Sequence, residues 1–135
     1  QKGQMVSPSQ FRGKKLVIYF YPKDNTPGCT TEACGLRDSH QQITDKNAIV
    51  LGISKDSQAS HLKFSEKFSL PFTLLSDVET TTIQAFGAWG EKKMCGKTYM
   101  GIIRSTFIVN EEGIITHVFP KVNTKTHAEE VLAVL

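Results

Sequence analysis

The segment LVIYFYPKDNTPGCTTEACGLRD, residues 16–38, contains the transition from strand to helix around which the predicted fold is built. Its first six residues are apolar, β-branched or aromatic, which is typical of a strand buried on both faces of a sheet. Pro22 ends this strand because proline has no N–H for the ladder. Turn-forming residues follow, and Thr26 is suited to be the N-cap and Pro27 the first residue of a helix. The helix is predicted to extend over about residues 28–44.

The remainder of the chain alternates between strand and helix patterns. The helix that starts at Ser57 is predicted to turn Leu62, Phe64 and Phe68 toward the core. Residues 87–101, which contain several glycines, are predicted to be a loop. Further strands are predicted at residues 48–53, 72–75, 102–109 and 114–119, and further helices at residues 80–86 and from residue 126 onward.

This order of elements predicts the fold class. Strands separated by helices pair in parallel through right-handed crossovers, and the turn at residues 110–113 adds an antiparallel edge. The predicted fold is α/β, with a central mixed β-sheet flanked by helices on both faces. A chain of 135 residues without internal repeats or linkers is predicted to form a single domain, residues 1–135.

The composition excludes several classes of protein. Hydrophobic residues make up 39% of the chain and charged residues 21%, as in ordinary soluble globular proteins. The net charge of +3 is too small and too scattered to indicate nucleic-acid binding. The basic pairs Lys14–Lys15 and Lys92–Lys93 are expected to be solvated surface. No apolar segment approaches the roughly 18 residues that cross a bilayer, so no membrane association is expected.

The three cysteines indicate thiol chemistry. Their number is odd, and the chain is large enough to fold without disulfides. This pattern argues against a secreted disulfide scaffold and favours reactive or metal-binding thiols in a reducing compartment. We therefore expect a cytoplasmic location.

Cys29 is placed where a thiol is readily activated. It falls in the first turn of the predicted helix, where unpaired N–H groups and the helix dipole favour the thiolate, the nucleophilic form. The same N–H groups can hold a polarised oxygen beside the sulfur. The hydroxyl of Thr26, three residues earlier, reaches the same place and can both donate and accept.

Cys34 follows five residues later, which sets a geometric constraint. Within an intact helix five residues rise ~7.5 Å and rotate ~140°. A disulfide needs its Cα atoms within roughly 4.4–6.8 Å. A disulfide between Cys29 and Cys34 therefore requires the first turns of the helix to unwind.

The residues alone leave three other interpretations open. Cys29 and Cys34 can be inert buried thiols. They can be zinc ligands, although Cys95 stands alone and no histidine follows at a ligand spacing. They can be a thiol-disulfide exchange pair, although the C-x-x-C spacing of such pairs is absent.

The stretch YPKDNTPGCTTEACGLRD resembles the active-site segment of the peroxiredoxins, in the branch called peroxiredoxin Q or bacterioferritin comigratory protein. Pro22, Thr26 and Cys29 match the P-x-x-x-T-x-x-C signature of that family. The similarity continues through LGISKDS, FTLLSD, FGAWGEKKMCGKTYMGIIRSTFIVNEEG and HVF, and it covers most of the chain from residue 13 onward. The resemblance implies a thioredoxin-like fold and the reduction of hydrogen peroxide and organic (alkyl) hydroperoxides, without a metal or an organic cofactor.

The resemblance also implies roles for single residues. Cys29 resembles the peroxidatic cysteine, and Cys34 resembles the resolving cysteine of the branch that carries it in the same helix. Thr26 resembles the residue that hydrogen-bonds the peroxide, and Pro22 the one that shields the pocket. Arg104 resembles the arginine that stabilises the thiolate and contacts the substrate.

The partner implied by the resemblance is a thioredoxin or glutaredoxin that restores both thiols. A resolving cysteine in the same chain needs no second subunit, so we expect a monomer. The resemblance implies no role for Cys95, which is expected to be an incidental thiol. Glu32 is expected to be a first-turn carboxylate that favours the helix dipole, and the four histidines to be structural or exposed.

Family members usually carry a β-hairpin before the position of Gln1, which leads us to expect that an amino-terminal segment is missing. The alternative function on the same fold is a non-enzymatic thiol redox sensor or a thiol-disulfide exchange protein. The peroxidase is favoured, because peroxide activation needs Thr26 and Arg104 in addition to a reactive cysteine.

Overall fold

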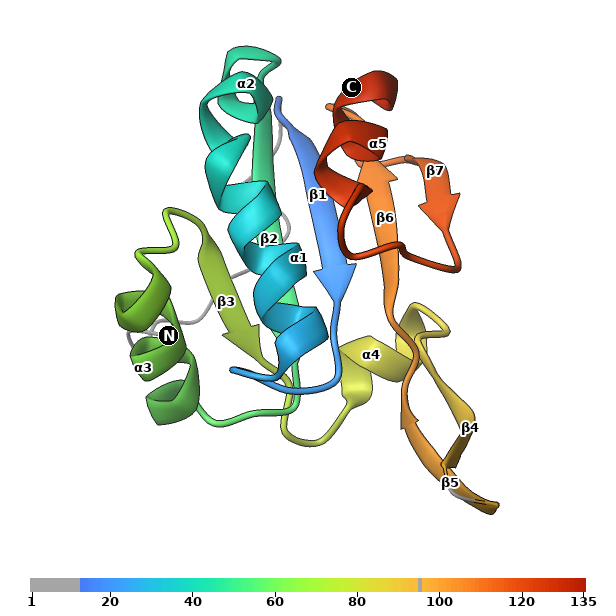
Figure 1. Ribbon diagram of the computed structural model, residues 1–135. Helices are drawn as coiled ribbons and strands as arrows, with labels where there is room; N and C mark the ends of the chain where they lie inside the picture. The colour runs from blue at the N-terminus through green and yellow to red at the C-terminus, as the bar shows by residue number, and fades with distance from the viewer. Residues whose placement is uncertain (1–12, 95) are drawn as a thin grey trace.

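The first apolar segment forms β1 (Lys15–Phe20), the central strand of a five-stranded sheet with the order β3-β2-β1-β6-β7. The computed structural model describes residues 13–94 and 96–135 (Figure 1). β1 pairs in parallel with β2 (Ala48–Ser54), which pairs in parallel with β3 (Thr73–Ser76). On its other side β1 pairs antiparallel with β6 (Ser105–Val109), which pairs antiparallel with β7 (Ile115–Phe119). The predicted mixed sheet and its antiparallel edge are confirmed.

Side chains that alternate along β1 divide the core into two clusters. Val17 and Tyr19 pack on the face covered by α1 (Pro27–Asp38) and α5 (His127–Val134), which lie in front of the sheet in Figure 1. Ile18 and Phe20 pack on the opposite face, where α4 (Thr81–Ala85) contributes the buried Ile83. Both faces of the sheet are therefore covered by helix, as predicted. No helix in the described residues has the length and apolar character that crossing a bilayer requires.

The predicted helix over residues 28–44 is wrong in one respect, because it is divided into α1 and α2 (His40–Asp45). Ser39 separates them with φ −98° and ψ 4°, outside regular helical geometry. The change of direction lets Ile43 of α2 pack fully buried in the same core cluster as Val50 of β2. No glycine or proline marks the break, so only the packing of the core decides it.

The predicted core face of α3 (Gln58–Phe68) also needs one correction. Leu62 is 37% exposed, whereas Phe64 is buried and Phe68 is packed against the core. The buried side of the helix begins at His61, and residues three, four and seven positions further on share a face with it. Leu62 lies one position off that stripe and therefore points to solvent.

Residues 87–101 are not the loop that was predicted. They contain β4 (Trp89–Met94) and part of β5 (Lys97–Ile102), which pair antiparallel as a two-stranded hairpin that extends away from the main sheet in Figure 1. The predicted strand over residues 102–109 is correspondingly split between β5 and β6. The side chains of β5 are mostly exposed, so the hairpin has no buried alternating face by which the sequence could reveal it. Positive φ at Gly96 allows its turn.

Gly52 in β2 is required by close packing. A Cβ atom there would lie 2.8 Å from Leu74 Cδ2 and 2.8 Å from the ring carbon Cζ of Tyr19. We predict that Gly52→Ala lowers the free energy of unfolding by about 1–3 kcal/mol through overpacking. Gly35→Ala is the control, because a Cβ there meets nothing closer than Ala128 at 3.9 Å and alanine favours helix. Denaturant unfolding of both variants checks this, and an unchanged midpoint for Gly52→Ala would contradict it.

Candidate active site

Cys29 lies in the first turn of α1. As predicted, Thr26 occupies the N-cap position and Pro27 opens the helix. The first helical hydrogen bond runs from the amide of Thr30 to the carbonyl of Thr26, at 2.8 Å. The Cys29 side chain is only 2% exposed. The sulfur is thus held close to the positive end of a helix and largely out of water.

Arg104 reaches Cys29 from the other side of the fold. It lies in the short unpaired connection between β5 and β6, and its Nη2 donates to the Sγ of Cys29 at 2.9 Å. Its Nη1 donates to Oε1 of Glu32 at 2.6 Å. Burial disfavours the guanidinium charge, but Cys29 and Glu32 outweigh it and raise the pKa of Arg104. One guanidinium therefore binds two side chains of α1 at once.

Glu32 is a site residue that the sequence reasoning missed. It was expected to be a first-turn carboxylate, but it lies beyond the first turn of α1, is 1% exposed and forms an ion pair with Arg104. Burial raises its pKa to about 7, against the opposing effect of Arg104. The spacing of three residues between Cys29 and Glu32 could have indicated this role. Residues three apart share one face of a helix, so Glu32 lies on the same side of α1 as Cys29.

Lys92 of β4 is a second cation near the site. Its Nζ donates to the carbonyl oxygen of Ile102 at 2.9 Å, at the point where β5 leads to Arg104. Burial and the charge of Arg104 lower the pKa of Lys92, while Cys29 acts in the opposite direction. The expectation that the pair Lys92–Lys93 is solvated surface is therefore wrong for Lys92 and correct for the exposed Lys93.

Thr26 and Pro22 lie on the turn that joins β1 to α1. The hydroxyl of Thr26 donates to the carbonyl of Lys23 at 2.9 Å and does not cap the helix. The proton of this hydroxyl is therefore already engaged, and its oxygen remains available as an acceptor. Tyr21 continues the pairing of β1, because its amide donates to the carbonyl of Ile53. Pro22 follows it directly and is half-buried.

Cys34 lies in the same helix as Cys29. α1 is continuous from Pro27 to Asp38, and both thiols are free. Cys34 is half-buried, in contrast to the buried Cys29. The two residues are therefore in the helical arrangement for which a disulfide requires unwinding. Cys95 lies outside the described residues.

A buried network ties the turn before α1 to α3 and β3. The carboxylate of Asp24 accepts from the hydroxyl of Tyr21 at 2.5 Å and from that of Ser60 at 2.7 Å, and it lies 2.8 Å from Nδ1 of His61. Nε2 of His61 is 3.0 Å from the carbonyl of Leu75, which only accepts, so Nε2 carries a proton. Burial acts to raise the pKa of Asp24, but its hydrogen bonds, first of all that with His61, outweigh burial and lower it.

Asp24, Asp56 and His61 are, within the described residues, the group close enough to hold a metal ion. Their atoms already have hydrogen-bond partners. Oδ2 of Asp56 accepts from the amide of Asp24 at 2.8 Å and from the hydroxyl of Ser54 at 2.7 Å. These hydrogen bonds explain why the three residues lie together, because they fix the turn before α1 to α3 and β2.

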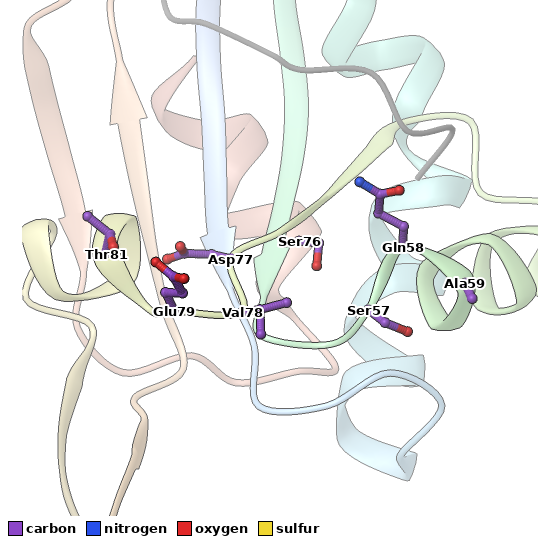
Figure 2. Close-up of a pocket in the computed structure, with 8 residues that line it drawn as sticks. All are labelled: Ser57, Gln58, Ala59, Ser76, Asp77, Val78, Glu79 and Thr81. Atoms are coloured by element: carbon purple, nitrogen blue, oxygen red, sulfur yellow. The ribbon is translucent and has the colours of Figure 1, made fainter.

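The pocket drawn in Figure 2 does not include the sulfur. It has a volume of about 580 Å³ and lies where β3 ends and α3 begins; its lining comprises Ser57, Gln58, Ala59, Ser76, Asp77, Val78, Glu79 and Thr81. A second hollow of about 370 Å³ shares Ser57 and Ala59 with it and reaches Asp24. Neither hollow is lined by Cys29 or Arg104, so neither carries the predicted chemistry.

The site thus consists of a cysteine at a helix start that is held by a half-buried arginine paired with a buried carboxylate. The profile of the AhpC/TSA family matches residues 1–118. The chain belongs to the AhpC/TSA family of peroxiredoxins. Peroxiredoxin Bcp of Bacillus subtilis is 50% identical over 133 residues, which cover 98% of this chain and 85% of that protein. Peroxiredoxin Bcp of Escherichia coli is 46% identical over 132 residues, with coverage of 98% and 85%.

Solved peroxiredoxin structures superpose closely on this one. A mutant of Xanthomonas campestris peroxiredoxin Q has a TM-score of 0.93 and 40% identity, and the match covers 98% of this chain and 84% of that one. The Xanthomonas campestris bacterioferritin comigratory protein, whose structures concern its alkyl peroxide reduction activity, has a TM-score of 0.91, 41% identity and coverage of 96% and 82%. The predicted thioredoxin-like fold and the predicted thiol peroxidase are confirmed at the level of the family, and the sensor alternative is set aside.

The raised pKa of Glu32 in this peroxiredoxin predicts that its contribution to the free energy of unfolding depends on pH. Its pKa is about 7 when folded against an ordinary 4.5, so its contribution to stability is fully present below about pH 4.5 and lost as pH rises through about 7. We expect the stability advantage of wild type over Glu32→Gln to fall by up to about 3 kcal/mol between about pH 5 and pH 8.

Urea unfolding at several pH values measures this difference. Both proteins carry Cys29→Ser, so that titration of the thiol does not contribute. The other titrating groups cancel in the comparison. A difference in unfolding free energy that does not change with pH would show that Glu32 titrates at its ordinary pKa.

Proposed function

We propose that this peroxiredoxin reduces hydrogen peroxide and alkyl hydroperoxides through oxidation of Cys29 and an intramolecular disulfide with Cys34. The observation that carries the proposal is the 2.9 Å hydrogen bond from Arg104 Nη2 to the Cys29 sulfur. A buried thiol beside a guanidinium and a helix N-terminus favours the thiolate, which is the attacking form.

In the first step the Cys29 thiolate attacks one peroxide oxygen. The S–O bond forms as the O–O bond breaks, and the leaving oxygen takes a proton and departs as water or an alcohol. The Arg104 guanidinium and the amides of the first helical turn stabilise the negative charge that develops on the oxygens. Thr26 accepts a hydrogen bond from the hydroperoxide hydroxyl, and Pro22 limits access of water to the sulfur. Cys29 becomes a sulfenic acid.

In the second step the Cys34 thiol displaces water from the sulfenic acid, and the disulfide forms. Because both cysteines lie in α1, residues 29–34 must leave helical geometry. Glu32 lies within this segment, so its ion pair with Arg104 has to break as the helix unwinds. A thioredoxin or glutaredoxin then reduces the disulfide by exchange, in which its own dithiol is oxidised. We propose a monomeric, single-domain, cytoplasmic enzyme, since the cycle needs no second subunit and relies on reduced thiols.

The cysteine assignment is tested by substitution. Cys29→Ser should abolish peroxide consumption, because serine at this position is not ionised and is a far weaker nucleophile. Cys34→Ser should retain one stoichiometric oxidation of Cys29 but stop or change recycling by thioredoxin. Cys95→Ser is the control and should turn over like wild type.

A coupled thioredoxin assay measures turnover, and mass spectrometry after one equivalent of peroxide locates the disulfide. Wild-type consumption by Cys29→Ser would overturn the peroxidatic assignment. A Cys29–Cys95 disulfide in wild type would overturn the role of Cys34.

Oxidation should also unwind α1. We predict that amide exchange of residues 29–34 becomes faster by about tenfold or more in the disulfide form, since the helical hydrogen bonds there are lost. The amides of β1 and β2 serve as the internal control and should stay protected. Hydrogen–deuterium exchange of the reduced and oxidised proteins checks this. Unchanged protection of residues 29–34 in a protein that carries the Cys29–Cys34 disulfide would rule out the proposed switch.

A further inference from the structure

We propose that His127 of α5 is a further positioning residue of the peroxidase site. It packs against Oε2 of the Glu32 carboxylate while Arg104 binds Oε1, and through Glu32 it restricts the position of the guanidinium against the Cys29 sulfur. The proposal rests on the proposed function and adds a residue from the carboxyl-terminal helix to the site.

His127 faces the reactive end of the site from the first turn of α5. It is 1% exposed, and its Nε2 lies 2.7 Å from Oγ1 of Thr106 and 3.8 Å from Oε2 of Glu32. Thr106 is fully buried on β6, two residues after Arg104. His127 therefore contacts the strand that follows Arg104 and also faces the carboxylate that Arg104 binds.

Both residues of this contact have a buried side-chain atom without a hydrogen-bond partner. In residues 13–94 and 96–135 the buried side-chain atoms without a hydrogen-bond partner are Tyr19 Oη, Glu32 Oε2 and His127 Nδ1. Leaving a buried polar atom unpaired costs about 1–3 kcal/mol. Glu32 Oε2 lies 3.8 Å from Nε2 of His127, the ring nitrogen that also contacts Thr106, and the second unpartnered atom, Nδ1, belongs to the same ring. Such a cost is expected at a functional site and not in a part of the core that serves stability alone.

The protonation of His127 suits it to hold a carboxylate without competing for it. Burial lowers the pKa of His127 to about 4, with Glu130 opposing and Arg104 adding to the effect. In the tautomer that carries its proton on Nε2, the neutral imidazole has a donor located between Thr106 and Glu32. A cation at this place would instead draw the carboxylate away from Arg104.

The helix that carries His127 is packed directly on α1. Beside Gly35 of α1, the space that a Cβ would fill is bounded by Ala128, at 3.9 Å. Gly35 lies outside residues 29–34, so this contact between α1 and α5 can persist while that segment unwinds. We therefore expect the contact between His127 and Glu32 to affect the position of Arg104 relative to Cys29 in the reduced form, in which α1 is intact.

The test uses the Cys34→Ser/Cys95→Ser protein, in which Cys29 is the single thiol. His127→Leu should slow the first oxidation by hydrogen peroxide roughly tenfold or more, because the guanidinium shifts from its position at the sulfur. It should also raise the pH midpoint of thiolate formation, followed by absorbance at 240 nm. His127→Gln keeps a donor and should retain a rate within about threefold of the parent. His117→Gln, at an exposed histidine of β7, is the control and should change neither quantity.

A folded His127→Leu protein with the parent rate and the parent midpoint overturns the proposal, even if its melting temperature falls. A second measurement does not depend on the folding of that variant. Glu32→Gln should shift the imidazole ¹⁵N resonances of His127 and leave those of His61 unchanged; an unchanged His127 spectrum also overturns the proposal. Either result leaves the proposed function standing as long as the parent protein is oxidised by peroxide, whereas loss of oxidation in the parent would overturn the proposed function itself.

Discussion

The contact of one arginine with two side chains of α1 is the interaction on which the site depends. Arg104 donates from separate nitrogens to Cys29 and Glu32, which lie three residues apart on one helix face. Arginine suits this place because its planar fork presents several donors in fixed directions, whereas lysine would offer a single point charge. Removing either α1 partner would leave a buried charge with half of its compensation, which links the position of the sulfur to a carboxylate that takes no part in the chemistry.

The same contact opposes the second half of the proposed cycle. Glu32 lies between the two cysteines in sequence, so the segment that unwinds for the disulfide is the segment that Arg104 holds in place. Burial of Glu32 acts in the other direction, because it raises the pKa of the carboxyl to about 7 and makes its charged form costly inside the folded site. Glu32 therefore has two opposing effects on α1. Its ion pair with Arg104 stabilises the helix, and the cost of burying its charge destabilises it. This balance is suited to a helix that is stable enough to orient a thiolate and weak enough to open.

Much of the framework was predictable because strong local patterns specify it. The apolar strands β1 and β2, the N-cap and proline at the start of α1, and the turn before β7 were all identified from residues adjacent in sequence. The errors fall where tertiary packing decides. The break at Ser39 serves the burial of Ile43, and the exposure of Leu62 follows from which stripe of α3 meets the sheet. The hairpin of β4 and β5 lacks a buried face, so no period of two appears in its sequence.

By itself, the sequence predicted the reactive group and determined a geometric limit on its chemistry. A cysteine in the first turn of a helix is placed where a thiol is readily activated, and any disulfide with a second cysteine five residues later requires unwinding, since both points follow from helix geometry. Only the tertiary structure decided the surroundings of the sulfur. Arg104 lies 75 positions from Cys29 in the sequence. The spacing of Glu32 from Cys29 could be read from the sequence, but the burial of Glu32 could not. Lys92 and His127 come from a hairpin and a helix whose places no local pattern specifies, because the packing of the sheet alone brings them to the site.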